Sequence, residues 1–131
     1  MKPKFATELA WQQAELLMQP AYIRLVDQIR RQTEENADIP VSYVEVTEPY
    51  PSNLMCLTKD DRELRVDIWE LCFQVCFTNF DEIRQYPEQV AQVDEHLFDP
   101  DSAEVDWTKL DHKAQAAVAQ VFARFKLLLA Q

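Results

Sequence analysis

Apolar residues at helical spacing predict a long helix at the end of the chain. Over residues 107–129, apolar positions recur in alternating steps of four and three, which is typical of one buried helix face. The same spacing is that of a seam between two helices, so this face suits either the core or a second subunit. The seam consists of Ala114, Val118, Val121, Phe125 and Leu128, with Phe122 and Leu129 beside them.

The N-terminal region predicts two helices that meet at a proline. Residues 5–18 have a helical apolar side, formed by Phe5, Leu9, Leu16 and Leu17. Because proline has no backbone N–H, Pro20 suits the first turn of a new helix better than the middle of one. A second helix is predicted over about 20–35, and Asn36 can replace glycine as its C-terminal cap. Its apolar stripe consists of Tyr22, Leu25, Val26 and Ile29.

The middle of the chain has the composition and alternation of β-strands. Residues 41–47 are rich in β-branched and aromatic side chains and predict one strand. A proline-containing connector follows at 48–53. Residues 54–57 and 63–67 then predict the two arms of a hairpin around a polar turn at 58–62.

Residues 68–79 fit either a helix or a strand. A polar residue at every fourth position agrees with both the 3.6-residue period of a helix and the two-residue period of a strand. In a strand, Cys72 and Cys76 would share the polar face, whereas in a helix they join the apolar face. Free cysteine is among the most buried residue types, which favours the helix. Asp67 and Glu70 are also spaced like the two members of a helix capping box. The aromatic and β-branched content favours the strand, which remains the alternative.

Capping signals predict a further helix after this segment. Asn79 can cap a helix that begins at Asp81, and Pro87 can restart it over about 88–97. Residues 98–106 are polar and rich in aspartate, and they predict a loop before the last helix.

Together these elements predict a single α+β domain over residues 1–131. A small antiparallel sheet, at about residues 41–67, is packed by the N- and C-terminal helices. A chain of this length is an ordinary size for one domain and can bury a core without disulfides.

The chain contains no glycine, which excludes several kinds of site. Phosphate loops and dinucleotide-binding turns need glycine so that the backbone can approach the ligand, and EF-hands need it for a sharp turn. Turns must therefore be few or be built by other residues. We expect them at Asn36, Asn53, Asp60–Asp61 and the seven prolines.

The formal net charge of −10 is concentrated in one part of the chain. Residues 81–111 contain ten acidic and two basic residues, a net charge of −8. This charge argues against nucleic acid as a partner, because phosphate contacts need a basic face. No apolar run approaches the length of a membrane span, so we expect no membrane association.

The acidic segment is a candidate interaction patch, formed by Asp94, Glu95, Asp99, Asp101, Glu104 and Asp106. An EF-hand frame starting at Asp99 fails, since Ala103, Glu104 and Leu110 occupy positions that need other residues. A patch of this charge attracts a basic partner. The alternative is a solvated loop that serves solubility alone.

A ligand pocket near Trp69, Glu70, Cys72 and Cys76 is the other candidate site. Two cysteines four apart share one helix face, but a metal site needs two further ligands at suitable spacing. Neither His96 nor His112 supplies such spacing, so two buried reduced thiols are the expected reading. The sequence assigns no catalytic residue, metal or cofactor.

Three segments resemble small uncharacterised proteins of cyanobacteria. They are Pro49–Pro51, Trp69–Phe77 and Val105–Asp111, and the likeness extends over most of the chain from about Ala21. The resemblance implies a soluble cytoplasmic protein. It carries over no activity and no site residue.

The sequence thus favours a non-enzymatic interaction, regulatory or assembly protein of the cytoplasm. Its partner is expected to be a protein, of basic character if the acidic segment faces it. The seam of the last helix also predicts self-association as a homodimer or other homo-oligomer. The alternative is a small-ligand-binding protein or enzyme that uses the pocket near Trp69. A third reading is an acidic mimic of nucleic acid.

Overall fold

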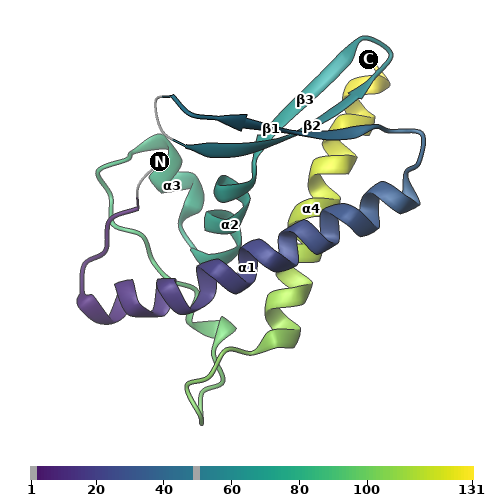
Figure 1. The fold of residues 1–131 in the computed structure, drawn as a ribbon. Coiled ribbons are helices and arrows are strands. Elements are labelled where there is room, and N and C mark those ends of the chain that lie inside the picture. Colours follow the sequence, from purple (N-terminus) through teal and green to yellow (C-terminus); the bar gives the residue numbers. More distant parts are fainter. Residues whose placement is uncertain (1–2, 49–50) are drawn as a thin grey trace.

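A computed structural model describes residues 3–48 and 51–131 and shows an α+β fold, as predicted (Figure 1). Residues 49 and 50 of the predicted connector lie outside the described residues. The elements in chain order are α1 (Glu8–Glu35), β1 (Val41–Val46), β2 (Ser52–Lys59), β3 (Arg62–Asp67), α2 (Ile68–Cys76), α3 (Phe80–Gln85), the 3-10 helix η1 (Glu95–Leu97) and α4 (Trp107–Leu129).

The N-terminal region forms one helix, α1, and the prediction of two helices that meet at Pro20 is wrong. Thr7 caps its start, since the hydroxyl oxygen accepts a hydrogen bond from the N–H of Ala10 at 3.1 Å. Pro20 lies inside the helix, where a proline costs about 3 kcal/mol relative to alanine. The helix continues because Leu17 and Ala21, on either side of Pro20, are both fully buried on its inner face. Packing of that face outweighs the local preference.

Of the three leucines expected on one apolar side of residues 5–18, Leu17 is buried and the placement of Leu9 and Leu16 is wrong. Leu9 is 64% exposed and Leu16 is 59% exposed, whereas Leu17 is fully buried. The predicted C-terminal cap is confirmed. The backbone N–H of Asn36 donates to the carbonyl of Gln32 at 2.9 Å, and its side-chain amide donates to the same carbonyl at 2.8 Å.

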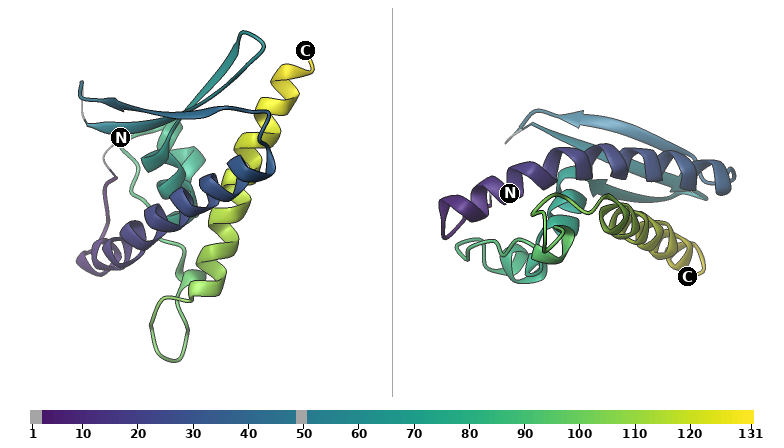
Figure 2. Two further views of the ribbon diagram at one scale, coloured as in Figure 1. Left: turned by 45° about the vertical axis from the view of Figure 1, so that its right-hand side comes forward. Right: turned by 90° about the horizontal axis from the view of Figure 1, so that it is seen from below.

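The three strands form an antiparallel sheet in the order β1-β2-β3, and the helices lie on one side of it (Figures 1 and 2). Met55 and Leu57 of β2 are fully buried. The predicted hairpin turn is confirmed, with left-handed φ values of 51° at Asp60 and 62° at Asp61. The turn expected at Asn53 is wrong, because this residue belongs to β2.

Residues 68–76 form helix α2, so the helical reading is confirmed and the strand alternative is wrong. The Asp67 carboxylate accepts a hydrogen bond from the N–H of Trp69 at 2.8 Å and begins the helix. Cys72 and Cys76 are both fully buried, which is the preference that favours a helix at the sequence level.

The helix predicted over 88–97 is wrong apart from the short η1 at its end. Asn79 precedes α3, but its side chain makes no capping hydrogen bond. Instead its amide donates to the carbonyl of Val90 at 2.9 Å and accepts from the N–H of Gln92 at 2.8 Å. The N–H of Ala91 also donates to the carbonyl of Lys4. Val90 and Val93 also form isolated β-bridges with Lys4 and Phe77. These contacts with distant residues take the place of helical hydrogen bonds over residues 90–93.

The last helix, α4, has the predicted bounds and packs against α1, α2 and β3. The Asp106 carboxylate caps it by accepting a hydrogen bond from the N–H of Lys109 at 3.2 Å. Its apolar seam is used inside the chain. Four of the seam residues are buried, namely Ala114, Val118, Val121 and Phe125.

The loop between η1 and α4 contains a strained alanine that the sequence does not signal. Phe98 and Val105 pair across the base of this loop. The Asp99 carboxylate accepts hydrogen bonds from the N–H groups of Asp101 at 2.8 Å and Ser102 at 3.1 Å. These contacts hold Ala103 at a φ of 59°, in the left-handed region.

We expect Ala103→Gly to stabilise the protein. The left-handed conformation costs an L-residue about 1–2 kcal/mol, and glycine's greater chain entropy offsets about 0.5–1 kcal/mol of the gain. The free energy of unfolding, measured by urea denaturation, should rise by about 0.5–1 kcal/mol. The matched control is Ala116→Gly on the exposed side of α4, which should lower it by about 1 kcal/mol. Destabilisation by both substitutions would contradict the left-handed loop.

Candidate functional site

Helix α1 exposes a row of apolar side chains on the face opposite the core. Leu9, Leu16 and Ile23 are spaced by seven residues, so they lie along one line of the helix. Their exposed fractions are 64%, 59% and 65%. We refer to these three residues as the apolar row. Large apolar side chains exposed in a line are a recurrent feature of surfaces that bind other proteins.

A hollow of about 600 Å³ separates the first half of this row from the loop before α4. Leu9 and Leu16 line it from α1, and Phe98 lines it from the other side. Glu95, Asp99 and Lys109 are the charged residues among its lining. We refer to it as the loop-side hollow. It brings part of the predicted acidic patch next to exposed leucines.

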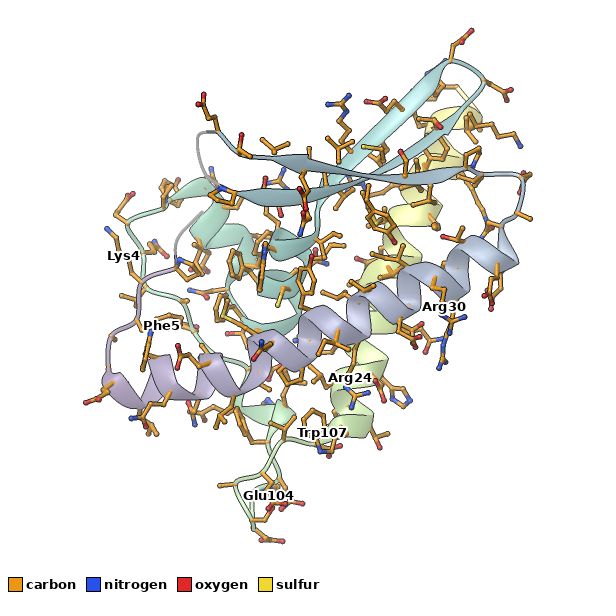
Figure 3. All side chains as sticks on the ribbon, viewed as in Figure 1. Lys4, Phe5, Arg24, Arg30, Glu104 and Trp107 are labelled. Carbon is orange, nitrogen blue, oxygen red and sulfur yellow. The ribbon has the colours of Figure 1, made fainter. Side chains whose placement is uncertain are left out.

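A second hollow, of about 470 Å³, lies farther along α1 and includes Ile23 and Arg24. The Arg24 guanidinium lies over the ring of Trp107, 4.9 Å from its centre, and donates a hydrogen bond to the Asp111 carboxylate at 2.6 Å. Figure 3 shows Arg24 and Trp107 close together and Glu104 near the outer end of the preceding loop. These contacts join α1 to the start of α4 beside the apolar row.

The six residues of the predicted acidic patch have different roles. Asp99 and Asp106 hold the loop and the start of α4 through hydrogen bonds to backbone N–H groups. Bonds from the N–H groups of Ser102 and Asp101 also lower the pKa of Asp99. Glu95, Asp101 and Glu104 are exposed, and of these three Glu95 lines the loop-side hollow.

Asp94 is buried and does not face a partner. Its carboxylate accepts hydrogen bonds from the Lys113 ammonium at 2.7 Å and from the N–H of His96 at 3.0 Å. The same ammonium donates to the carbonyl of Val75 at 2.6 Å, so Asp94 and Lys113 connect η1, α4 and α2. Burial raises the pKa of Asp94, but the hydrogen bond and charge of Lys113 outweigh it and leave the pKa below its ordinary value of 3.8.

The four residues of the predicted ligand pocket are placed differently from one another. Cys72 and Cys76 are fully buried, and the Cys72 thiol donates to the carbonyl of Met18 at 3.1 Å. The neighbouring Cys76 thiol and burial raise the pKa of Cys72, which keeps it protonated. Glu70 is half-buried. Trp69 lines a hollow of about 500 Å³ together with residues of α1 and the N-terminal segment.

This hollow and the loop-side hollow lie on different sides of α1. The sequence predicts Trp69 as a pocket residue but none of the other residues that line this hollow. Phe5, Trp11 and Trp69 contribute aromatic rings to it, and Met18 and Glu15 also line it. We refer to it as the aromatic hollow. Helical spacing of three and four is the sequence signal that places its α1 residues together, as for Trp11 and Glu15.

Within residues 3–48 and 51–131, no group of three or more His, Cys, Asp or Glu side chains is arranged to hold a metal ion. In the same described part of the chain, no helix combines the length and the apolar character needed to cross a membrane. Comparisons with protein-family models, with curated proteins and with solved structures give no match to this chain. The resemblance to small cyanobacterial proteins therefore stays a prediction.

We expect Asp94→Asn to destabilise the protein in a pH-dependent way. Because the pKa of Asp94 is lowered in the folded state, its ionised form stabilises the fold above about pH 4, and this contribution is lost as the pH falls through the folded pKa. At pH 7 the variant should lose about 1–3 kcal/mol in the free energy of unfolding, the usual effect of removing a charged hydrogen bond.

The difference between wild type and Asp94→Asn should narrow as the pH falls from about 5 to about 3. The control is Asp38→Asn, since Asp38 forms an exposed ion pair with Lys59 that should contribute little. If Asp94→Asn lowered the free energy of unfolding equally at pH 7 and pH 3, Lys113 would not be stabilising an ionised Asp94.

Proposed function

We propose that this protein is a non-enzymatic interaction protein that binds a basic, amphipathic helix of a partner protein. The observation that carries the proposal is the apolar row on α1. Leu9, Leu16 and Ile23 recur at the seven-residue spacing of a seam between helices, and all three are more than half exposed. Hollows beside the row provide room for the side chains of a partner helix.

The charge around the row supports a basic partner. Glu95 and Asp99 line the loop-side hollow with Leu9 and Leu16. The basic side chains among its described lining residues are Lys109 and His96. Residues 81–111 as a whole have a net charge of −8. A helix with an apolar seam and lysine or arginine flanks would match both the row and the acidic rim.

The nature and placement of the reactive side chains favour binding over catalysis. The three cysteines, Cys56, Cys72 and Cys76, are buried and form no disulfide. The side chain of His96 is 92% exposed. Buried thiols and a solvated imidazole are poor starting points for nucleophilic or acid–base chemistry. Reduced cysteines also support the expected cytoplasmic location.

Self-association as a homodimer remains the competing use of the row. The seam of α4 on which the homodimer was predicted packs inside the chain, so a second copy would need another surface such as the apolar row. A second copy would place like charges near one another in a protein of net charge −10, which opposes this pairing. We therefore favour the basic partner.

The test uses three designed helical peptides with the same leucine seam and with lysine, glutamine or glutamate flanks. Fluorescence anisotropy should show the tightest binding for the lysine peptide and the weakest for the glutamate peptide, with affinity falling as salt rises. Leu16→Asp should weaken binding of the lysine peptide at least about tenfold, since burial of a leucine contributes about 1.5–3 kcal/mol.

The matched control is Tyr43→Asp, which places the same charge at an exposed aromatic residue of β1, away from the row. It should bind the lysine peptide like wild type. Equal binding of all three peptides, or wild-type affinity of Leu16→Asp, would refute the proposal. A dimer at tens of micromolar that Leu16→Asp dissociates, seen by light scattering, would assign the row to a second copy instead.

A further inference from the structure

The aromatic hollow is formed by three parts of the chain that are distant in sequence. Phe5 comes from the segment before α1, Trp11 and Met18 from α1, and Trp69 from the start of α2. Figure 3 shows Phe5 in the segment that leads into the first turns of α1. The volume of about 500 Å³ is that of a small-molecule site, for which about 300–1,000 Å³ is usual.

Two of the three aromatic rings are held in place by further rings outside the hollow. Trp69 packs against Tyr22 with a distance of 4.6 Å between ring centres, and the Tyr22 hydroxyl accepts a hydrogen bond from the Asn53 amide at 3.0 Å. Phe5 packs edge-on against Phe77 at 5.8 Å. Rings fixed in this way lose little freedom when a ligand binds, which favours affinity.

The charge of the lining points to a cation. Among the residues that the structure describes, the lining contains one charged side chain, Glu15, and no lysine, arginine or histidine. Glu15 lies one helical turn from Trp11, so both side chains lie on the same side of α1. The faces of aromatic rings carry partial negative charge and attract cations, most strongly in the case of tryptophan.

We propose that the aromatic hollow binds an organic cation of the quaternary-ammonium class. Glu15 and Gln19 are the strong hydrogen-bond acceptors among the described lining residues, whereas the rings and the Met18 thioether accept weakly or not at all. A primary ammonium has three donors, so against the aromatic wall it would lose more hydration than these two side chains replace. Methyl groups on the nitrogen replace its N–H donors and spread the positive charge over an apolar surface, which matches aromatic side chains. The site is separate from the apolar row and does not depend on the helix-binding function.

The test uses choline and its uncharged carbon analogue, 3,3-dimethylbutan-1-ol, as probes. A Trp107→Phe background removes the one tryptophan outside the hollow, so fluorescence reports on Trp11 and Trp69. Choline should give a saturable change, and the uncharged analogue should bind at least about tenfold more weakly. Equal binding of the two compounds, or no saturation by about 50 mM choline, would overturn the proposal.

Two substitutions test the walls in the same background. Trp11→Ala, at a residue that is 47% exposed, should weaken choline binding by about fivefold to thirtyfold, and Glu15→Gln should weaken it severalfold. Circular dichroism and the urea midpoint confirm that each variant is folded. The control is Trp107→Phe itself, which should bind choline like wild type by NMR titration. Unchanged choline affinity of a folded Trp11→Ala variant would also overturn the proposal.

Discussion

Burial of one face of α1 across Pro20 is the constraint on which the rest of the structure depends. Leu17, Ala21 and Leu25 are fully buried on that face, and α1 packs against both α2 and α4. If residues 8–35 formed two separate helices, the axis of one would not determine the axis of the other. One continuous helix instead fixes the direction of every other face of α1, including the apolar row and the sides that line the two candidate sites.

The parts of the fold that the sequence predicts well are those decided by local physics. The α4 seam, the preference of Cys72 for the interior and the Asp60–Asp61 turn all depend on residues close together in the chain. The continuity of α1 and the bridged conformation of residues 90–93 depend on distant partners. Packing of α1 on α2 and α4 outweighs the tendency of Pro20 to end a helix. The Asn79 side chain forms hydrogen bonds with the carbonyl of Val90 and the N–H of Gln92, which a helix would pair within itself.

The candidate sites were harder to predict for the same reason. A leucine repeat fits a buried face and an exposed face equally well, so the pattern predicts burial of Leu9 and Leu16 although both are exposed. Asp94 belongs to an acidic run in the sequence, but Lys113, nineteen residues away, makes it part of the interior. Phe5, Trp11 and Trp69 meet only because α1 brings the N-terminal segment beside α2. Only the acidic character of the loop before α4 and Trp69 itself are visible beforehand.

The most direct test of a continuous α1 is a set of backbone NMR chemical shifts and amide exchange rates for residues 8–35. We expect helical Cα shifts from Glu8 to Glu35 without a break at Pro20, and slow amide exchange at buried Ala21 and Leu25. Non-helical shifts at residues 17–20, with fast exchange at Ala21, would show two separate helices. The apolar row and the aromatic hollow would then not be held at fixed positions relative to one another by one continuous helix.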